Sequence, residues 1–202
     1  MGAVNHAKLS SSAIVLVATL FVCAGMYAAS FRLARVIKIN TTDSMPIGIY
    51  VMRSDTIAPG RIVVACPPEA AARIGLENGY LEHGSCTTGA APVLKYVAAT
   101  GGSHVAVTDS GILINGRLLD NSVARRNDHR GRVIPHVHIG TYRLGEDEVW
   151  LYSPASWSWD SRYFGPISTK EIVGSASPLL IMPRRTSPER LPSKYDPASR
   201  RE

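Results

Sequence analysis

The sequence lacks the two patterns that most readily identify a serine hydrolase. It contains no G-x-S-x-G motif, and none of its six histidines stands in a recognisable catalytic triad context. Cysteine is also scarce, with three residues in 202. A two-cysteine metal site would need further ligands, and no nearby histidine spacing supplies them. We therefore expect neither a bound metal nor another cofactor.

Charged residues make up only 19% of the chain, and hydrophobic residues make up 45%. This composition excludes wholesale disorder, and the length suits one domain with a sizeable core. The net charge of +6 is uneven, because residues 183–202 hold six basic and three acidic side chains among four prolines. We predict a flexible basic tail there, which is more typical of a solvated segment than of a lipid or nucleic-acid contact.

One segment carries no charge at all. Residues 13–29 read AIVLVATLFVCAGMYAA. An uncharged run of this length lies at the short end of a membrane-spanning helix and also suits the core of a signal peptide. We expect a membrane-spanning or signal helix over residues 13–30, after a short segment 1–12 and before a folded domain over 31–182.

The few cysteines are consistent with export. Cys23 lies inside the apolar segment, which leaves Cys66 and Cys86 as the only pair in the remainder. In an oxidising compartment these two can close a loop of about 20 residues, which is worth about 3 kcal/mol in the chain-entropy model. The alternative is that they are two unrelated thiols.

After the apolar segment, the sequence is typical of a mainly β domain. Runs rich in β-branched and aromatic residues, separated by Gly, Pro, Asn and Asp, predict short strands. They cover residues 36–40, 48–52, 61–66, 93–100, 104–108, 148–152 and 171–177. The Asn115-Gly116 pair in GILINGRLL predicts a hairpin. Residues 68–79 form the one helix-like stretch, which we expect as a small helical insertion.

Ser44 lies in the motif DSMP, shortly after the apolar segment. In isolation this motif is a turn, because Asp and Ser cap backbone amides and Pro restricts the residue before it. A nucleophilic serine would need a base. Lys95 is a candidate, since it lies in the apolar run VLKYVAAT. It either reaches solvent from a strand edge or is buried, and burial would lower its pKa towards the range of a general base.

Two further stretches have alternative interpretations. WSWDSRYFGPIS holds Asp160, Ser161 and Arg162. It is either a surface turn with a weak ion pair or a loop that orients a catalytic residue. His136 and His138 would share one face of a strand, but without a third ligand a solvent-facing loop is favoured over metal or nucleic-acid binding.

In combination, these features resemble the type I signal peptidase superfamily of Ser/Lys proteases. The shared order is an apolar segment, DSMPIGIY, a strand lysine about 50 residues later, an INGRLL hairpin and DSRYFGPI. The resemblance covers about residues 39–177 and is closest to the TraF-type peptidases of conjugative transfer. The short region between the lysine strand and the late motif also fits that branch. The resemblance implies a signal-peptidase-like β domain.

The resemblance also assigns roles to individual residues. Ser44 matches the nucleophile and Lys95 the general base of a Ser/Lys dyad, which explains the missing histidine. Thr42 matches the hydroxyl that forms the oxyanion hole together with the backbone N–H of Ser44. Asp160 falls in the late motif, where TraF-type enzymes use an aspartate, and is the third expected catalytic residue, which would hold Lys95 or the Ser44 loop through hydrogen bonds. The expected supporting residues are Ser161 and Arg162.

The implied substrate is a membrane-held precursor of a conjugative pilin, matured on the periplasmic side of a bacterial inner membrane. Maturation would occur by hydrolysis, or by cyclisation through the pilin's own amine. We expect the membrane and other conjugation proteins as partners, and no direct nucleic-acid contact. The alternatives are a housekeeping signal peptidase and a non-catalytic periplasmic scaffold. A self-cleaving repressor is disfavoured, because those proteins carry a DNA-binding helix pair in place of the apolar segment.

Overall fold

The computed structural model describes residues 11–182 and divides the chain into two compact units. One unit ends at Ile37 and the other begins at Lys38. The expected basic tail over residues 183–202 lies outside the described residues, as do most of residues 1–12. The predicted domain divisions stay predictions.

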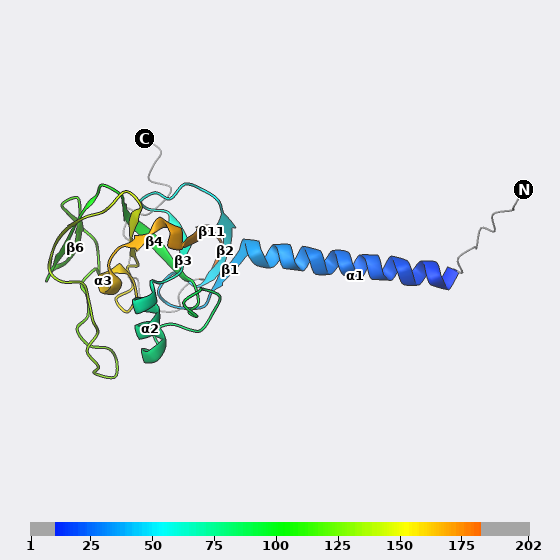
Figure 1. Cartoon of the computed structure of the whole chain (residues 1–202), viewed down its shortest axis with the longest axis horizontal. Helices are drawn as coiled ribbons and strands as arrows, with labels where there is room; N and C mark the ends of the chain where they lie inside the picture. The colour runs from blue at the N-terminus through cyan, green and yellow to red at the C-terminus, as the bar shows by residue number, and fades with distance from the viewer. Residues whose placement is uncertain (1–10, 183–202) are drawn as a thin grey trace, which may run out of the picture. The chain divides into compact units, whose positions relative to one another are not determined.

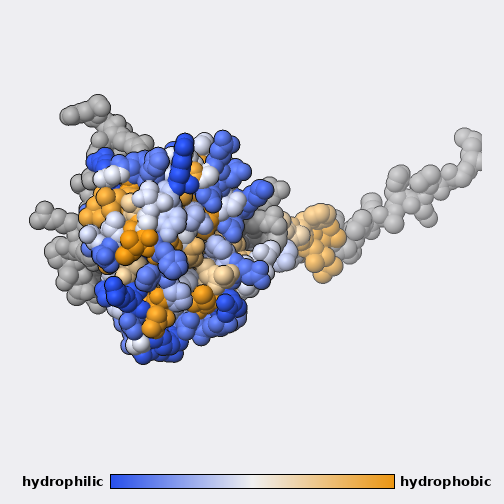
Figure 2. All heavy atoms as spheres, turned by 60° about the vertical axis from the view of Figure 1, so that its left-hand side comes forward, coloured by the Kyte–Doolittle hydropathy of each residue, from blue (hydrophilic) through white to orange (hydrophobic). Residues whose placement is uncertain are grey.

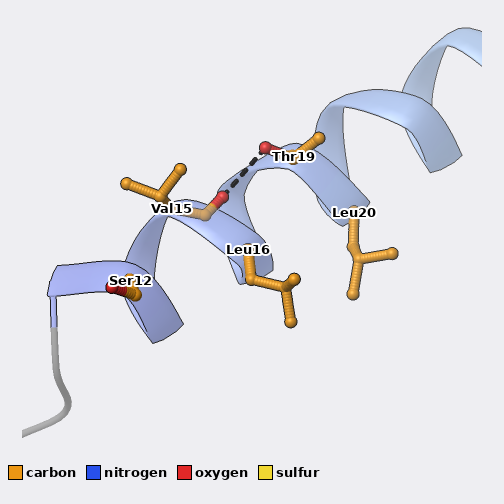
Figure 3. A pocket seen from close by; sticks show the side chains of 5 residues that line it. All are labelled: Ser12, Val15, Leu16, Thr19 and Leu20. Atoms are coloured by element: carbon orange, nitrogen blue, oxygen red, sulfur yellow. Dashed lines mark hydrogen bonds between the residues drawn. The ribbon is translucent and has the colours of Figure 1, made fainter.

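The first unit is formed by helix α1 (Ser11–Val36), which contains the whole uncharged segment. Many of its apolar side chains are exposed, and Phe21 and Tyr27 are 75% and 76% exposed. Figure 3 shows a stretch of its surface, where Thr19 Oγ1 donates a hydrogen bond of 2.9 Å to the Val15 carbonyl oxygen. That stretch offers only apolar and hydroxyl side chains. Among residues 11–182, no helix combines the length and apolar character needed to cross a membrane.

The second unit is built on a seven-stranded sheet with the order β1-β2-β11-β3-β4-β9-β10. These strands are β1 (Ile37–Asn40), β2 (Gly48–Arg53), β3 (Ile62–Ala65), β4 (Val93–Thr100), β9 (Glu148–Tyr152), β10 (Ile167–Ser168) and β11 (Ile172–Ile181). Strand β11 pairs antiparallel with β2 and with β3, and β4 pairs antiparallel with β3 and with β9. The last described strand therefore lies between two strands from the beginning of the domain (Figure 1).

A smaller sheet has the order β7-β6-β5-β8. Its strands are β5 (His104–Thr108), β6 (Gly111–Ile114), β7 (Arg117–Leu118) and β8 (Gly140–Arg143). Asn115 and Gly116 connect β6 to β7 with φ angles of 49° and 79°. A two-residue type I′ turn requires positive φ at both positions, which Asn and Gly tolerate best. The predicted hairpin and the mainly β fold class are confirmed.

The core of the second unit lies on both faces of β4. Six of its eight residues are buried, which explains why its sequence is almost continuously apolar instead of alternating. Leu94 and Tyr96 pack with Tyr50, whereas Val97 packs with Val63 in a separate cluster. Figure 2 shows a mainly hydrophilic face of the molecule with small hydrophobic patches.

Helix α2 (Glu69–Asn78) lies inside a loop that the Cys66–Cys86 disulfide closes. The helix ends at Gly79, whose φ of 76° is left-handed, and the Gly79 N–H donates to the Leu76 carbonyl oxygen at 3.2 Å. Glycine suits this position because it has no Cβ to strain. Both the predicted helical insertion and the predicted disulfide are present.

Removing the disulfide should destabilise the domain without affecting α1. We expect Cys66→Ala combined with Cys86→Ala to lower the free energy of unfolding by about 3 kcal/mol, because the unfolded chain gains freedom. Urea denaturation of the oxidised protein measures this change. Cys23→Ala is the matched control, since Cys23 is an exposed free thiol. An unchanged unfolding midpoint in the double variant would show that the cross-link does not stabilise the fold.

The sequence interpretation was incomplete or wrong in several places. A further helix, α3 (Ser161–Phe164), begins after Asp160, whose side chain accepts a hydrogen bond from the Arg162 N–H. The capping aspartate looked like a turn residue because both roles use the same side-chain acceptor. The solvent-facing loop favoured for His136 and His138 is confirmed, because both lie exposed in an irregular segment; Pro135, between β7 and β8, lacks the N–H that a strand ladder uses. Strands β8 and β10 were not expected, and β11 continues four residues beyond its predicted end.

Candidate active site

Ser44 lies in the turn that connects β1 to β2. The residues that follow it are anchored in the core. Met45 is buried and packs with Tyr50, while the Tyr50 hydroxyl donates a 2.6 Å hydrogen bond to the Pro46 carbonyl oxygen. Ser44 itself is half-buried. The turn therefore presents the serine from a backbone that is fixed behind it.

Asn40, the last residue of β1, organises this turn and was not identified from the sequence. Its side chain is 7% exposed. Its amide nitrogen donates to the carbonyl oxygens of Thr42, Met45 and Pro46 at 2.9, 3.0 and 3.1 Å. One buried amide thus satisfies backbone oxygens on both sides of Ser44. Only the ring of backbone oxygens distinguishes this asparagine from the many that occur in ordinary turns.

The Thr42 hydroxyl lies beside the serine hydroxyl. Thr42 Oγ1 is 3.1 Å from Ser44 Oγ, and it donates to Asn40 Oδ1 at 3.1 Å. Because a hydroxyl has one proton, Ser44 is the donor in the contact between the two hydroxyls. The resting serine therefore directs its proton towards Thr42.

Lys95 lies on β4, opposite Val63 of β3, and is 2% exposed. The lysine is therefore buried in the middle of the sheet and does not reach solvent from an edge. Burial lowers the Lys95 pKa from 10.5 to about 8; the Asp160 charge opposes this shift and the Arg162 charge reinforces it. At pH 7, about a tenth of the Lys95 amine is thus neutral, which is the form that a general base needs.

Asp160, Ser161 and Arg162 are all fully buried. The Arg162 Nε and Nη2 atoms donate to the two oxygens of Asp160, both at 2.8 Å. Such a two-point contact between guanidinium and carboxylate fixes both side chains. Ser161 Oγ accepts a hydrogen bond of 2.8 Å from the Leu151 N–H, which ties α3 to β9. The surface-turn alternative for this stretch is therefore wrong.

The late motif is joined to the serine turn by Ser153, another residue that the sequence did not reveal. The Ser153 N–H donates to Asp160 Oδ2 at 3.0 Å, and the Ser153 hydroxyl donates to the Ser44 carbonyl oxygen. Arg162 Nη2 in turn donates to the Ala155 carbonyl oxygen at 2.9 Å. The buried ion pair thus supports the backbone of Ser44 through one intervening serine.

A cleft of about 980 Å³ brings the predicted reactive residues together. Thr42, Ser44 and Lys95 all line it. Its volume is at the upper end of the range for ligand sites, and it suits several residues of an extended peptide. Further lining residues come from β1, from the disulfide-closed loop and from the loop after β9, including Lys38, Ile39, Tyr80, Leu81, Glu82, Ser156 and Trp157. Asp160, Ser161 and Arg162 are buried and do not line the cleft.

The cleft offers groups for acyl transfer. It holds a hydroxyl, a buried amine of lowered pKa and a second hydroxyl next to the first. In chemical terms, these groups can act as a nucleophile, a base and a donor to a developing oxyanion. Within residues 11–182, no group of three or more His, Cys, Asp or Glu side chains is arranged to hold a metal ion.

Comparison with known proteins identifies the family. The model of the family described as signal peptidase, peptidase S26, matches residues 8–180. The chain belongs to this family. A plasmid transfer protein TraF from Escherichia coli is 38% identical over 170 residues, which cover 81% of this chain and 90% of that protein. A second Escherichia coli plasmid transfer protein TraF is 37% identical over 145 residues, covering 71% and 82%. The predicted resemblance is confirmed.

A match to a solved structure carries less weight than these sequence matches. A signal peptidase I from Enterococcus faecalis V583 is 18% identical, and the match covers 61% of this chain and 98% of that chain. The TM-score is 0.36. This similarity is too low to carry an argument about the site, so the family assignment rests on the sequence matches.

Proposed function

We propose that the chain is a serine endopeptidase with a Ser44/Lys95 dyad. One observation carries the proposal: the Ser44 hydroxyl and the buried Lys95, whose pKa is lowered to about 8, line the same cleft. Membership of the peptidase S26 family supports this chemistry. No metal or cofactor is needed, since the dyad itself supplies nucleophile and base.

In the proposed reaction, neutral Lys95 accepts the proton of Ser44 Oγ while that oxygen attacks the scissile carbonyl carbon. The carbon–nitrogen bond then breaks, and the Lys95 ammonium gives the proton to the leaving amine. This step leaves an ester between the substrate acyl group and Ser44 Oγ. Attack on the ester by water or by a second amine, with Lys95 again accepting a proton, releases the product and restores the serine.

The Thr42 hydroxyl and the Ser44 N–H are the proposed donors to the oxyanion, once the Thr42 proton turns from Asn40 Oδ1 towards the substrate. We expect Thr42→Val to lower kcat about 100-fold, because valine keeps the shape but removes one donor. Steady-state processing of the precursor measures this rate. Thr41→Val is the matched control, since Thr41 is exposed in the same cleft. A normal kcat for Thr42→Val would remove Thr42 from the oxyanion hole.

Asn40 is proposed to position the nucleophile. We expect Asn40→Asp to lower kcat about 100-fold with little change in KM, because a carboxylate cannot donate to the three carbonyl oxygens and the turn shifts. The same steady-state assay separates the effect on kcat from the effect on KM, and thermal unfolding checks that the variant is folded. Asn127→Asp, at an exposed asparagine that donates one hydrogen bond, should leave kcat unchanged. A KM effect alone would contradict the positioning role.

The proposed substrate is the precursor of a conjugative pilin, held at the periplasmic face of a bacterial inner membrane. The relatives support this assignment by their names, since they are plasmid and conjugal transfer proteins. The exposed apolar side chains of α1 support a role as a signal segment or as a membrane contact that does not require α1 to span the bilayer. The Cys66–Cys86 disulfide supports an oxidising compartment. Other conjugation proteins are the proposed partners.

The decisive experiment is mass spectrometry of the pilin from cells that carry wild-type or Ser44→Ala protein. We expect mature pilin only with the wild-type protein. A product lighter than the linear chain by one water would reveal cyclisation through the pilin's own amine, whereas equal masses would reveal hydrolysis. Normal maturation with Ser44→Ala would favour a non-catalytic scaffold. Equal processing of unrelated exported proteins would favour a housekeeping signal peptidase.

A further inference from the structure

Three side chains form a stack at the rim of the cleft, which we call the Trp157 stack. The Arg125 guanidinium carbon lies 3.9 Å from the centre of the Trp157 ring, and the His129 ring stacks on Trp157 with a centroid distance of 3.5 Å. Trp157 is 46% exposed and lines the cleft that also contains Ser44. A cation is therefore held against an aromatic ring that faces the proposed substrate.

The segment that carries Arg125 is anchored to the domain. The Arg125 N–H donates to the Tyr163 hydroxyl of α3 at 3.2 Å. Asp128 accepts from the Tyr80 hydroxyl at 2.8 Å and forms an ion pair of 2.6 Å with Arg132. These contacts fix the backbone on both sides of His129. The guanidinium of Arg125 is thus preorganised beside the cleft, which reduces the entropy cost of binding a ligand.

The arginines of residues 125–132 differ in whether a nearby carboxylate neutralises their charge. Arg132 is paired with Asp128, and Arg126 lies 3.9 Å from Asp109. Arg125 forms no ion pair with any carboxylate within residues 11–182. A guanidinium stacked on an aromatic ring still presents its N–H groups at the edge. Arg125 does not itself line the cleft but contacts Trp157, which does, so it can offer two parallel donors to a carboxylate at the rim beside Trp157.

We propose that the Trp157 stack is a subsite for an acidic residue of the polypeptide substrate, an Asp or Glu near the scissile bond. This inference rests on the proposed peptidase function and names a specificity determinant for it. The carboxylate would bind the Arg125 guanidinium, while the exposed edge of Trp157, whose two faces Arg125 and His129 cover, contacts the adjacent chain. A lipid headgroup is a weaker fit, because the cation lies against a ring that belongs to the peptide cleft.

The test is cleavage of a randomised peptide library by the full chain in non-ionic detergent, with products identified by mass spectrometry. Wild-type protein should select Asp or Glu at one position near the cut, with about tenfold higher kcat/KM than for a matched Gln peptide. Arg125→Glu should lose this selection and favour Lys or Arg there. Arg126→Glu, the same change at the neighbouring exposed arginine, should keep the wild-type selection. Arg125→Gln should lose selection without reversing it.

The outcomes separate this subsite from the proposed function. Cleavage by the wild type with no acidic preference would overturn the subsite and leave the peptidase intact. A wild type that cleaves neither library nor pilin precursor would overturn both. Sedimentation with phosphatidylcholine vesicles that contain phosphatidylglycerol distinguishes a lipid site. If Arg125→Glu weakens vesicle binding and retains the acidic preference, the subsite proposal is overturned.

Discussion

Ser44→Ala is expected to abolish pilin maturation, lowering the rate by at least about 10⁴-fold. The hydroxyl is the atom that would form the ester, and no other group in the described cleft replaces it at the same position. The fold should survive, because within residues 11–182 the Ser44 side chain forms one hydrogen bond, with Thr42 Oγ1, while the Ser44 carbonyl oxygen is still held by Ser153. Quantitative immunoblotting of precursor and mature pilin measures the loss.

Ser156→Ala is the control for that variant. Ser156 lines the same cleft and is also partly buried. The substitution removes a serine hydroxyl from a different part of the cleft lining, so we expect normal maturation. If Ser156→Ala were as inactive as Ser44→Ala, the loss would reflect damage to the cleft and not removal of the nucleophile.

Lys95→Met should have a comparable effect on maturation, because methionine keeps most of the volume and removes the base.

For wild-type protein, the rate should rise with pH up to about 8, the pKa that burial gives Lys95, and level off above it. Only the neutral amine can accept the serine proton. Rates measured between pH 6 and 10 at about unit steps test the profile. A rate that falls as pH rises through 8 would exclude Lys95 as the base.

The same substitution should stabilise the fold, which separates it from a structural defect. The Lys95 pKa is lower in the folded protein than its usual value, so burial of the ammonium opposes folding wherever both states hold the proton. That penalty is full below about pH 8 and disappears as pH rises from about 8 to 10.5. We therefore expect Lys95→Met to raise the unfolding temperature most at pH 7 and least above pH 10. Lys170→Met, at an exposed lysine, should change neither stability nor activity.

The sequence predicted the parts of the fold that local patterns specify. The hairpin at Asn115-Gly116 follows from two residues that accept positive φ, and β4 follows from a continuous apolar run. Helix α3 was missed because its four residues are too few to show a helical period. Its start depends on the capping carboxylate of Asp160, which local sequence cannot distinguish from a turn.

The site was predictable only where a motif marks a residue. Ser44 and Lys95 belong to a recognisable order of motifs, but the burial of Lys95 depends on strands β3 and β9, which are distant in sequence and flank β4 in the sheet. Asn40 and Ser153 act through backbone oxygens that only the folded turn brings to them. The Asn40 contacts are local, at separations of 2, 5 and 6 residues, but resemble those of any turn asparagine. The Ser153 contact with Ser44 spans 109 residues and leaves no pattern in the sequence.

The most direct test of the account is to locate the covalent intermediate. Wild-type protein mixed with pilin precursor is quenched in acid during turnover, digested and analysed by mass spectrometry. The dyad mechanism predicts an acyl group on the peptide that contains Ser44, present with wild-type protein and absent with Ser44→Ala and with Lys95→Met. An acyl group on any other residue, or active turnover by the Lys95→Met protein, would contradict the Ser44/Lys95 mechanism.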